Sequence, residues 1–111
     1  MDGKSMDRES LENQFWNHYL AVLVAQGIKD SHHTWYVGYC EAFIRANKDT
    51  RLKQHTYSTV SAYLSIQINA ENLAAWQKKQ VIDALKLLFK CIHAPLYREI
   101  DWDYWMLSRE I

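Results

Sequence analysis

Residues 72–93 read NLAAWQKKQVIDALKLLFKCIH, the longest uninterrupted helical pattern in a chain of 111 residues. Apolar residues recur along it at helical spacing, which predicts one buried face made of Val81, Leu85, Leu88 and Ile92. The same spacing places a polar stripe on the opposite face, made of Lys79, Asp83, Lys86 and Lys90. Asn72 is the expected N-cap, and Pro95 ends the pattern because proline has no amide donor. One long helix, packed by one side and hydrated on the other, is therefore predicted.

The composition is typical of one small domain with a firm core. Aromatic residues make up 14% of the chain and carry large apolar area, whereas only three glycines and one proline are present. Few glycines and prolines argue against a turn-rich β fold.

The polar N-terminus predicts no signal peptide, and no apolar run is long enough to span a bilayer. Cys40 and Cys91 lie in apolar helical patterns, which predicts free buried thiols and a cytoplasmic protein.

The net charge is zero but unevenly distributed. Residues 1–12 carry a net charge of −2 and residues 99–111 carry −3, while residues 13–98 carry +5. A mildly basic body between acidic ends is compatible with an anionic partner without requiring one.

A first helix is predicted over about residues 11–26. Ser10 can cap it, and Gly27 fits the position where a left-handed residue ends a helix. Its expected inward stripe is Trp16, Tyr19, Leu20 and Leu23.

A second helix is predicted over about residues 32–47, opened by Asp30 or Ser31. Its expected buried face is Trp35, Tyr39, Ala42, Phe43 and Ala46. The expected outer face is Thr34, Gly38, Glu41 and Arg45. Because a mid-helix glycine is unfavourable, Gly38 predicts a close approach to the backbone by a crossing helix or, less favoured, by a ligand.

The third element, over residues 57–68, is ambiguous between strand and helix. Its apolar residues alternate like those of a strand, yet Val60, Leu64 and Ile68 also repeat at helical spacing. A lone strand would have no partner, so a helix capped by Thr56 is preferred. Leu52 is expected to anchor the preceding loop on the core. After Pro95, Asp101 or Asp103 is expected to cap a short final helix, or the segment is expected to fold back on the core. The predicted fold is all-α: a compact, orthogonal four-helix bundle with a short C-terminal helix.

Catalytic and metal-binding patterns are absent from the sequence. His32-His33 and Cys91-x-His93 each lack the second ligand pair that a zinc site needs. No glycine-rich phosphate loop occurs, and no nucleophile, base and orienting group stand at a recognisable spacing. The chain is therefore predicted to be non-catalytic, with no cofactor, metal or small-molecule substrate.

Polar helix faces remain as candidate sites. Glutamine can pair with adenine and lysine can neutralise phosphates, so the Gln and Lys residues of residues 77–90 favour DNA binding. The alternative at this point is an ordinary hydrated helix face, supported by the pairing of Lys79 with Asp83 one turn later.

The order of four segments resembles the N-terminal core-binding domain of tyrosine recombinases, the SAM-like domain of phage and integron integrases. The segments are FWNHYLAVLVAQGI, SHHTWYVGYCEAFI, HTYSTVSAYLSIQI and WQKKQVIDALKLLF, followed by EIDWDYW. The resemblance covers about residues 11–105. The polar residues 1–10 before it are expected to form a disordered N-terminal tail. The resemblance implies a helical domain over 11–98 and a linker from residue 99 toward a catalytic domain that this sequence does not contain.

The resemblance also implies a function. Such a domain clamps recombination-site DNA for DNA integration and recombination, its second and fourth helices face the major groove, and its partners are double-stranded DNA and other integrase protomers. Carried onto this chain, the DNA contacts are His33, Thr34, Tyr36, Val37, Gln77, Lys78, Gln80 and Lys86. The location would be the cytoplasm, associated with the nucleoid. The main alternative is a helical protein-interaction domain that exposes Trp102 and Trp105, and a helix-turn-helix regulator is a weaker one.

Overall fold

The computed structural model describes the chain over residues 3–107, with side chains from Ser10 onward. Its helices are α1 (Gly3–Ala25), α2 (Asp30–Ala46), α3 (Tyr57–Ile68), α4 (Ala75–Cys91), α5 (Leu96–Glu99) and α6 (Trp102–Leu107), with a short 3-10 helix, η1 (Leu52–Gln54). No strand occurs over residues 3–107, so the predicted all-α bundle with four substantial helices is confirmed. The ends of the predicted tail and linker, residues 1–2 and 108–111, lie outside the described residues.

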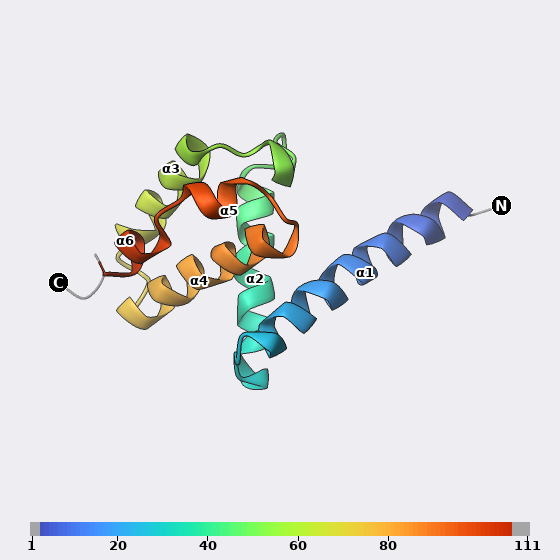
Figure 1. Cartoon of the computed structure of the whole chain (residues 1–111), viewed down its shortest axis with the longest axis horizontal. Coiled ribbons are helices and arrows are strands. Elements are labelled where there is room, and N and C mark those ends of the chain that lie inside the picture. The colour runs from blue at the N-terminus through green and yellow to red at the C-terminus, as the bar shows by residue number, and fades with distance from the viewer. Residues whose placement is uncertain (1–2, 108–111) are drawn as a thin grey trace.

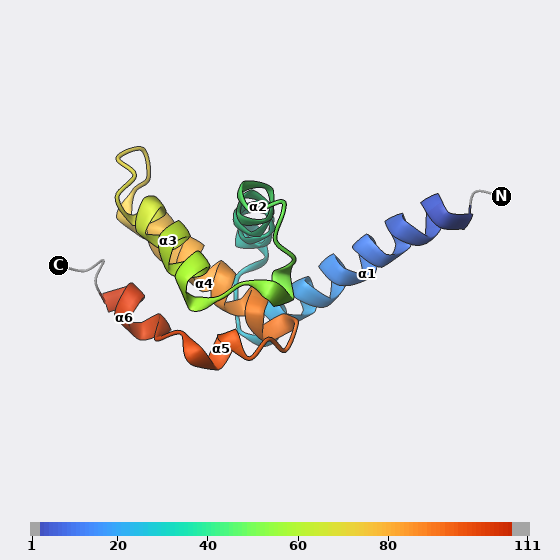
Figure 2. The same cartoon turned by 90° about the horizontal axis from the view of Figure 1, so that it is seen from above.

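Helix α4 is the centre of the molecule. Figures 1 and 2 show α2 crossing it on one side and α5 with α6 covering the other, while the N-terminal half of α1 projects away from the body. Burial extends around more of α4 than the single face predicted, and its buried residues are Val81, Ile82, Ala84, Leu85, Leu87, Leu88, Phe89 and Cys91. The predicted polar stripe is half-buried rather than fully hydrated, and Asp83 within it accepts a hydrogen bond from Tyr36 of α2.

Helix α1 begins at Gly3 rather than after Ser10 and ends as predicted. Tyr19 and Leu23 are fully buried, as their place on the inward stripe predicted. At the C-terminus the Ile28 amide donates to the Leu23 carbonyl at 3.0 Å, and the Gly27 amide donates to the Val24 carbonyl at 3.0 Å. Gly27 has φ 77°, so the helix ends in a Schellman motif with glycine in the left-handed position.

Helix α2 is rotated relative to the prediction. Its buried residues are Tyr36, Cys40 and Phe43, whereas Trp35 is 46% exposed and Ala46 is also exposed. Trp35 and Tyr36 are adjacent aromatic residues, so a shift of one position turns the apparent buried face by about 100°. The close approach predicted at Gly38 is also wrong, because a Cβ added there would meet nothing within 4 Å.

Helix α3 is confirmed, and the strand alternative is wrong. Thr56 and Thr59 form a reciprocal capping box: the Thr59 amide donates to Thr56 Oγ1 at 3.3 Å, and the Thr56 amide donates to Thr59 Oγ1 at 3.0 Å. Leu52 packs against the core, as the predicted loop anchor should.

The boundaries of α4 differ from the prediction. The N-cap is Ala74 rather than Asn72, and the Gln77 side chain satisfies the Ala74 amide through its Oε1 at 2.8 Å. The helix ends in a second Schellman motif, in which the Ala94 amide donates to the Phe89 carbonyl and the His93 amide to the Lys90 carbonyl, both at 3.1 Å. Here the left-handed residue is His93, with φ 55°.

The C-terminal segment folds back on the core. Asp101 caps α6, since its Oδ1 accepts the Tyr104 amide at 3.1 Å. Trp102 is 5% exposed and Trp105 is 9% exposed, and Trp102 Nε1 donates to the Tyr97 carbonyl at 2.9 Å. The expectation that these two tryptophans form an exposed partner surface is therefore wrong.

Candidate nucleic-acid interface

The two helices expected to face DNA pack directly on each other. Tyr39 Oη of α2 donates to Gln80 Oε1 of α4 at 3.1 Å, and Tyr36 Oη donates to Asp83 Oδ2 at 2.7 Å. These bonds hold the first half of α2 beside the first half of α4. The outer flanks of both helices therefore join into one continuous surface.

A groove of about 400 Å³ lies where those flanks meet. Thr34, Trp35, Gly38 and Tyr39 line it from α2, and Gln77 lines it from α4. Thr34 and Gln77 were predicted as DNA contacts, and the fold brings them to the same groove. Gly38 leaves the groove open, because no atom occupies the space where its side chain would lie.

Sequence reasoning did not select two exposed tryptophans here as site residues: Trp35, which lines the groove, and Trp76, whose ring lies near that of Trp35. Trp35 is 46% exposed and Trp76 is 50% exposed, and their ring centroids are 5.3 Å apart. The His32 ring stacks on Trp35 at 5.8 Å with an angle of 4° between the planes. The sequence signal for Trp76 was its position directly before the Gln77–Gln80 polar run, which favours an exposed first turn. Because His32 stacks on Trp35 and Trp35 lies beside Trp76, His32 is on the same side of the molecule as the start of α4.

Gln77 and Gln80 each form one hydrogen bond within the protein. Gln77 Oε1 accepts from the Ala74 amide, and Gln80 Oε1 accepts from Tyr39. Each side chain amide also has an NH₂ group with two donors. Both glutamines therefore use their Oε1 atoms within the protein, and their NH₂ groups are the part of each side chain that could donate to a ligand.

Three predicted contacts from α2 lie elsewhere. Tyr36 is 5% exposed, and burial, followed by its hydrogen bond to Asp83, raises its pKa. His33 Nε2 bonds with the Ile28 carbonyl at 2.9 Å, which turns its ring back to the loop between α1 and α2. Val37 is half-buried against the core. The groove and these three residues lie on different flanks of α2.

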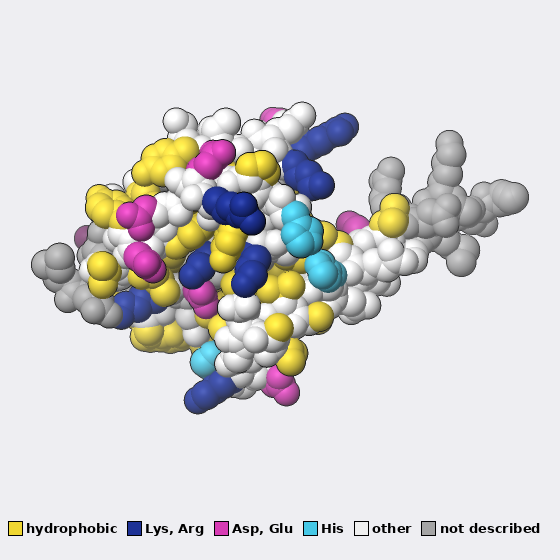
Figure 3. Space-filling model, in the orientation of Figure 1, with side chains coloured by type: hydrophobic (Ala, Val, Ile, Leu, Met, Phe, Trp, Pro, Cys, Tyr) yellow, Lys and Arg dark blue, Asp and Glu magenta, His cyan; other side chains and the backbone are white. Residues whose placement is uncertain are grey.

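The two lysines predicted as DNA contacts, Lys78 and Lys86, do not lie on the same side of α4. Lys78 precedes Lys86 by eight residues, which is about 80° around an α-helix. Lys86 belongs to the half-buried polar stripe with Lys79, Asp83 and Lys90, whereas Lys78 does not. Figure 3 shows Lys and Arg side chains gathered over the middle of one face, where α4 and α5 lie, with His side chains between this group and α1. The two predicted lysines therefore extend in different directions around α4.

The buried thiols offer no nucleophile. Burial raises the pKa of Cys40 to about 12, and Cys40 Sγ lies 3.2 Å from Tyr19 Oη. Burial also raises the pKa of Cys91. Among the residues that the structure describes, no three His, Cys, Asp or Glu side chains are grouped to hold a metal ion.

None of the described helices combines the length and the apolar character needed to cross a bilayer. Comparison of the chain with protein-family models, curated proteins and solved structures finds no match.

Proposed function

We propose that this chain is a DNA-binding module of a site-specific tyrosine recombinase, a SAM-like core-binding domain that holds recombination-site DNA for a separate catalytic domain. The observation that carries the proposal is the packing of α2 on α4 through the Tyr39–Gln80 and Tyr36–Asp83 hydrogen bonds. It makes one surface of the two helices to which the family resemblance assigns DNA contact.

The chemistry of that surface fits a duplex. Thr34 and Gln77 present hydrogen-bonding groups at an open groove, which is the chemistry that reads base edges. The lysines of the α4 stripe supply positive charge for phosphates without base specificity. Asp83 is the one acidic residue of that stripe, and its carboxylate accepts a hydrogen bond from the Tyr36 hydroxyl.

The test is binding to a duplex of about 30 base pairs, followed by fluorescence anisotropy between 50 and 200 mM salt. Lys86→Glu is expected to weaken binding several-fold and to make the salt dependence shallower, because each neutralised phosphate contributes about 0.9 to the slope of log K against log salt. Lys48→Glu is the matched control, since Lys48 is exposed in the loop after α2. Equal losses in the two variants, or none in Lys86→Glu, would contradict the proposal.

A second candidate is a helical protein-interaction domain. The exposed Trp35–Trp76 pair favours it, because large aromatic side chains dominate the binding energy of many interfaces. Trp35→Ala with Trp76→Ala separates the two functions in sedimentation with and without duplex. Loss of self-association with DNA affinity retained supports the protein interface, and loss of DNA affinity from a protein that stays monomeric supports the nucleic-acid interface.

A further inference from the structure

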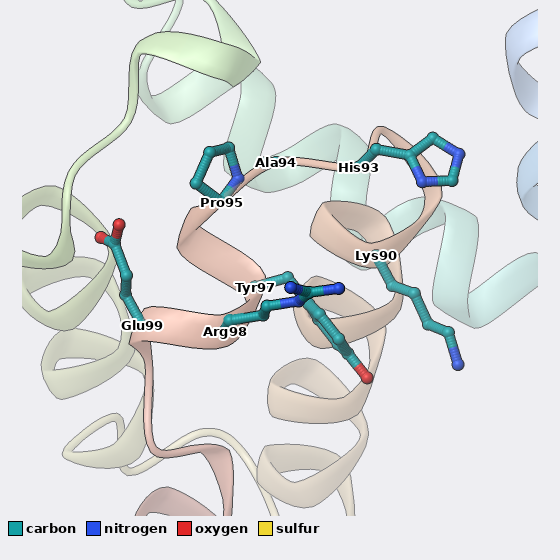
Figure 4. Close-up of a pocket in the computed structure, with 7 residues that line it drawn as sticks. All are labelled: Lys90, His93, Ala94, Pro95, Tyr97, Arg98 and Glu99. Carbon is teal, nitrogen blue, oxygen red and sulfur yellow. The ribbon is translucent and has the colours of Figure 1, made fainter.

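A second basic site lies at the corner between α4 and α5, outside the α2–α4 groove. A cavity of about 650 Å³ opens there, lined by Lys90, His93 and Ala94 and by the α5 region through Pro95, Tyr97, Arg98 and Glu99. Figure 4 shows Lys90, His93 and Arg98 extending to the same side as Tyr97, whereas the Glu99 carboxylate extends away from them. Three groups able to carry positive charge therefore share one opening.

Both strong cations in this cavity are available to a ligand. Lys90 Nζ lies 5.9 Å from the centroid of the Tyr97 ring, which holds the ammonium over an aromatic face without neutralising it. Neither Lys90 nor Arg98 forms an ion pair over the part of the chain whose side chains are described. Arg98 adds a planar guanidinium that can bind two oxygens of one anion.

The backbone at His93 is a second and independent observation. Helices α1 and α4 end in the same Schellman motif, with Gly27 in the left-handed position of the first and His93 in that of the second. Glycine is favoured there because a Cβ is strained at positive φ. A strained non-glycine residue is typical of functional positions, and here it places an imidazole at the rim of the cavity.

We infer that this corner binds a phosphate group of a nucleic-acid backbone, with Lys90 and Arg98 as the ligands and His93 as a hydrogen-bond donor at the rim. Lys90 is one turn beyond Lys86 on the α4 stripe, so the corner extends the same basic surface. The inference deepens the proposed function and, for the nucleic-acid source of the phosphate, rests on it.

The first experiment needs no DNA. Inorganic phosphate is titrated into the protein at constant ionic strength, and amide chemical shifts are followed by NMR. Saturable shifts concentrated in residues 90–99 are expected, and Lys90→Gln with Arg98→Gln should weaken them at least tenfold. Lys48→Gln with Lys53→Gln, which removes the same charge from exposed positions near η1, should leave them unchanged. Shifts spread over the surface, or equally reduced by both pairs, would overturn the site.

His93→Gly separates binding from folding. The variant should lose several-fold in phosphate affinity while its melting temperature stays the same or rises, since glycine relieves the left-handed strain. A lower melting temperature with unchanged phosphate affinity would show that His93 serves the fold alone and would remove it from the site.

The source of the phosphate is decided with the duplex. Lys90→Gln with Arg98→Gln should reduce the salt slope of DNA binding by nearly two, as expected for two lost phosphate contacts. If phosphate binds but this slope does not change, the nucleic-acid assignment fails and the ligand is a free phosphate. If the wild-type protein binds phosphate at the corner but no duplex, the proposed function fails while the anion site stands.

Discussion

At the residue scale, single buried polar groups decide how the helices are locked together. The Tyr19 hydroxyl of α1 donates to the Ala84 carbonyl of α4 at 2.9 Å, and Cys40 Sγ of α2 lies 3.2 Å from the Tyr19 hydroxyl oxygen. Three helices thus meet at one hydroxyl that has no access to water. Buried polar groups are tolerated when they are hydrogen-bonded, and this one also fixes the relative rotation of the helices.

His55 is the other buried polar residue, at 7% exposed, and its protonation state follows from its neighbours. Thr59 Oγ1 has one proton, which it donates to the Thr56 carbonyl, so His55 Nδ1 must donate to Thr59 Oγ1 at 2.9 Å. His55 Nε2 is then an acceptor with no partner among the described residues. Desolvation by burial lowers the pKa of His55, because protonation would bury a charge and an unpaired N–H group.

This lowered pKa predicts a loss of stability in acid. Above about pH 6.5 the ring is neutral in both states, and below it the unfolded chain takes up a proton that the folded chain excludes. The free energy of unfolding should then fall by at most about 1.4 kcal/mol per pH unit, and level off below the folded pKa. Urea denaturation from pH 5 to 8 measures it, and His55→Phe should show a shallower acid slope. Identical slopes in both proteins would exclude His55 as the cause.

At the element scale, the rotation of α2 is the main departure from the sequence pattern. The apolar spacing placed Trp35 on the buried face, although the residue that follows it, Tyr36, is also aromatic. The contacts with α4 select Tyr36, because its hydroxyl reaches Asp83 while its ring is buried. As a result Trp35 is turned outward and lines the groove beside Gly38, which was predicted on the outer face.

Gly38 offers a direct test of that groove. Gly38→Ala should stabilise the protein by about 0.5–1 kcal/mol, because α2 gains helix propensity and the added Cβ meets no atom within 4 Å. Gly38→Lys should tighten duplex binding and steepen its salt slope by about one contact. Ala62→Lys is the control, since Ala62 is exposed on α3. An equal gain in affinity from both lysines would mean that the groove has no special role.

At the scale of the whole molecule, a single core joins residues from α1, α2, α3, α4, α5 and α6. The N-terminal part of α1 projects away from this core (Figures 1 and 2). Leu11 is 64% exposed, and Tyr19 is the first fully buried residue after Ser10. The charge pattern is also a property of the whole fold, since Lys90 of α4 and Arg98 of α5 line the same cavity only because α5 folds back on α4 (Figure 4).

This arrangement predicts two classes of amide hydrogen exchange. Amides of residues 11–15 should exchange at least about 100-fold faster than those of residues 81–89, because local fraying costs less than global unfolding. Residues 36–43 of α2 should exchange with the slow class, since they share the core with α4. Exchange measured by NMR checks the assignment, and slow exchange over residues 11–15 would require a partner surface for the first half of α1.

Sequence patterns predicted the all-α fold class, the Thr56 cap of α3 and the Gly27 helix end, and they narrowed the cap of the last helix to Asp101 or Asp103, because each depends on local spacing or on one side-chain bond. They also predicted Thr34 and Gln77 as site residues, which the fold brings together. The tertiary structure alone decided which side of α2 is buried, that Trp102 and Trp105 lie in the core, and that Lys90, His93 and Arg98 share a cavity. Those outcomes depend on how helices distant in the sequence cross and cover one another, and the periodicity of a single helix contains no information about that.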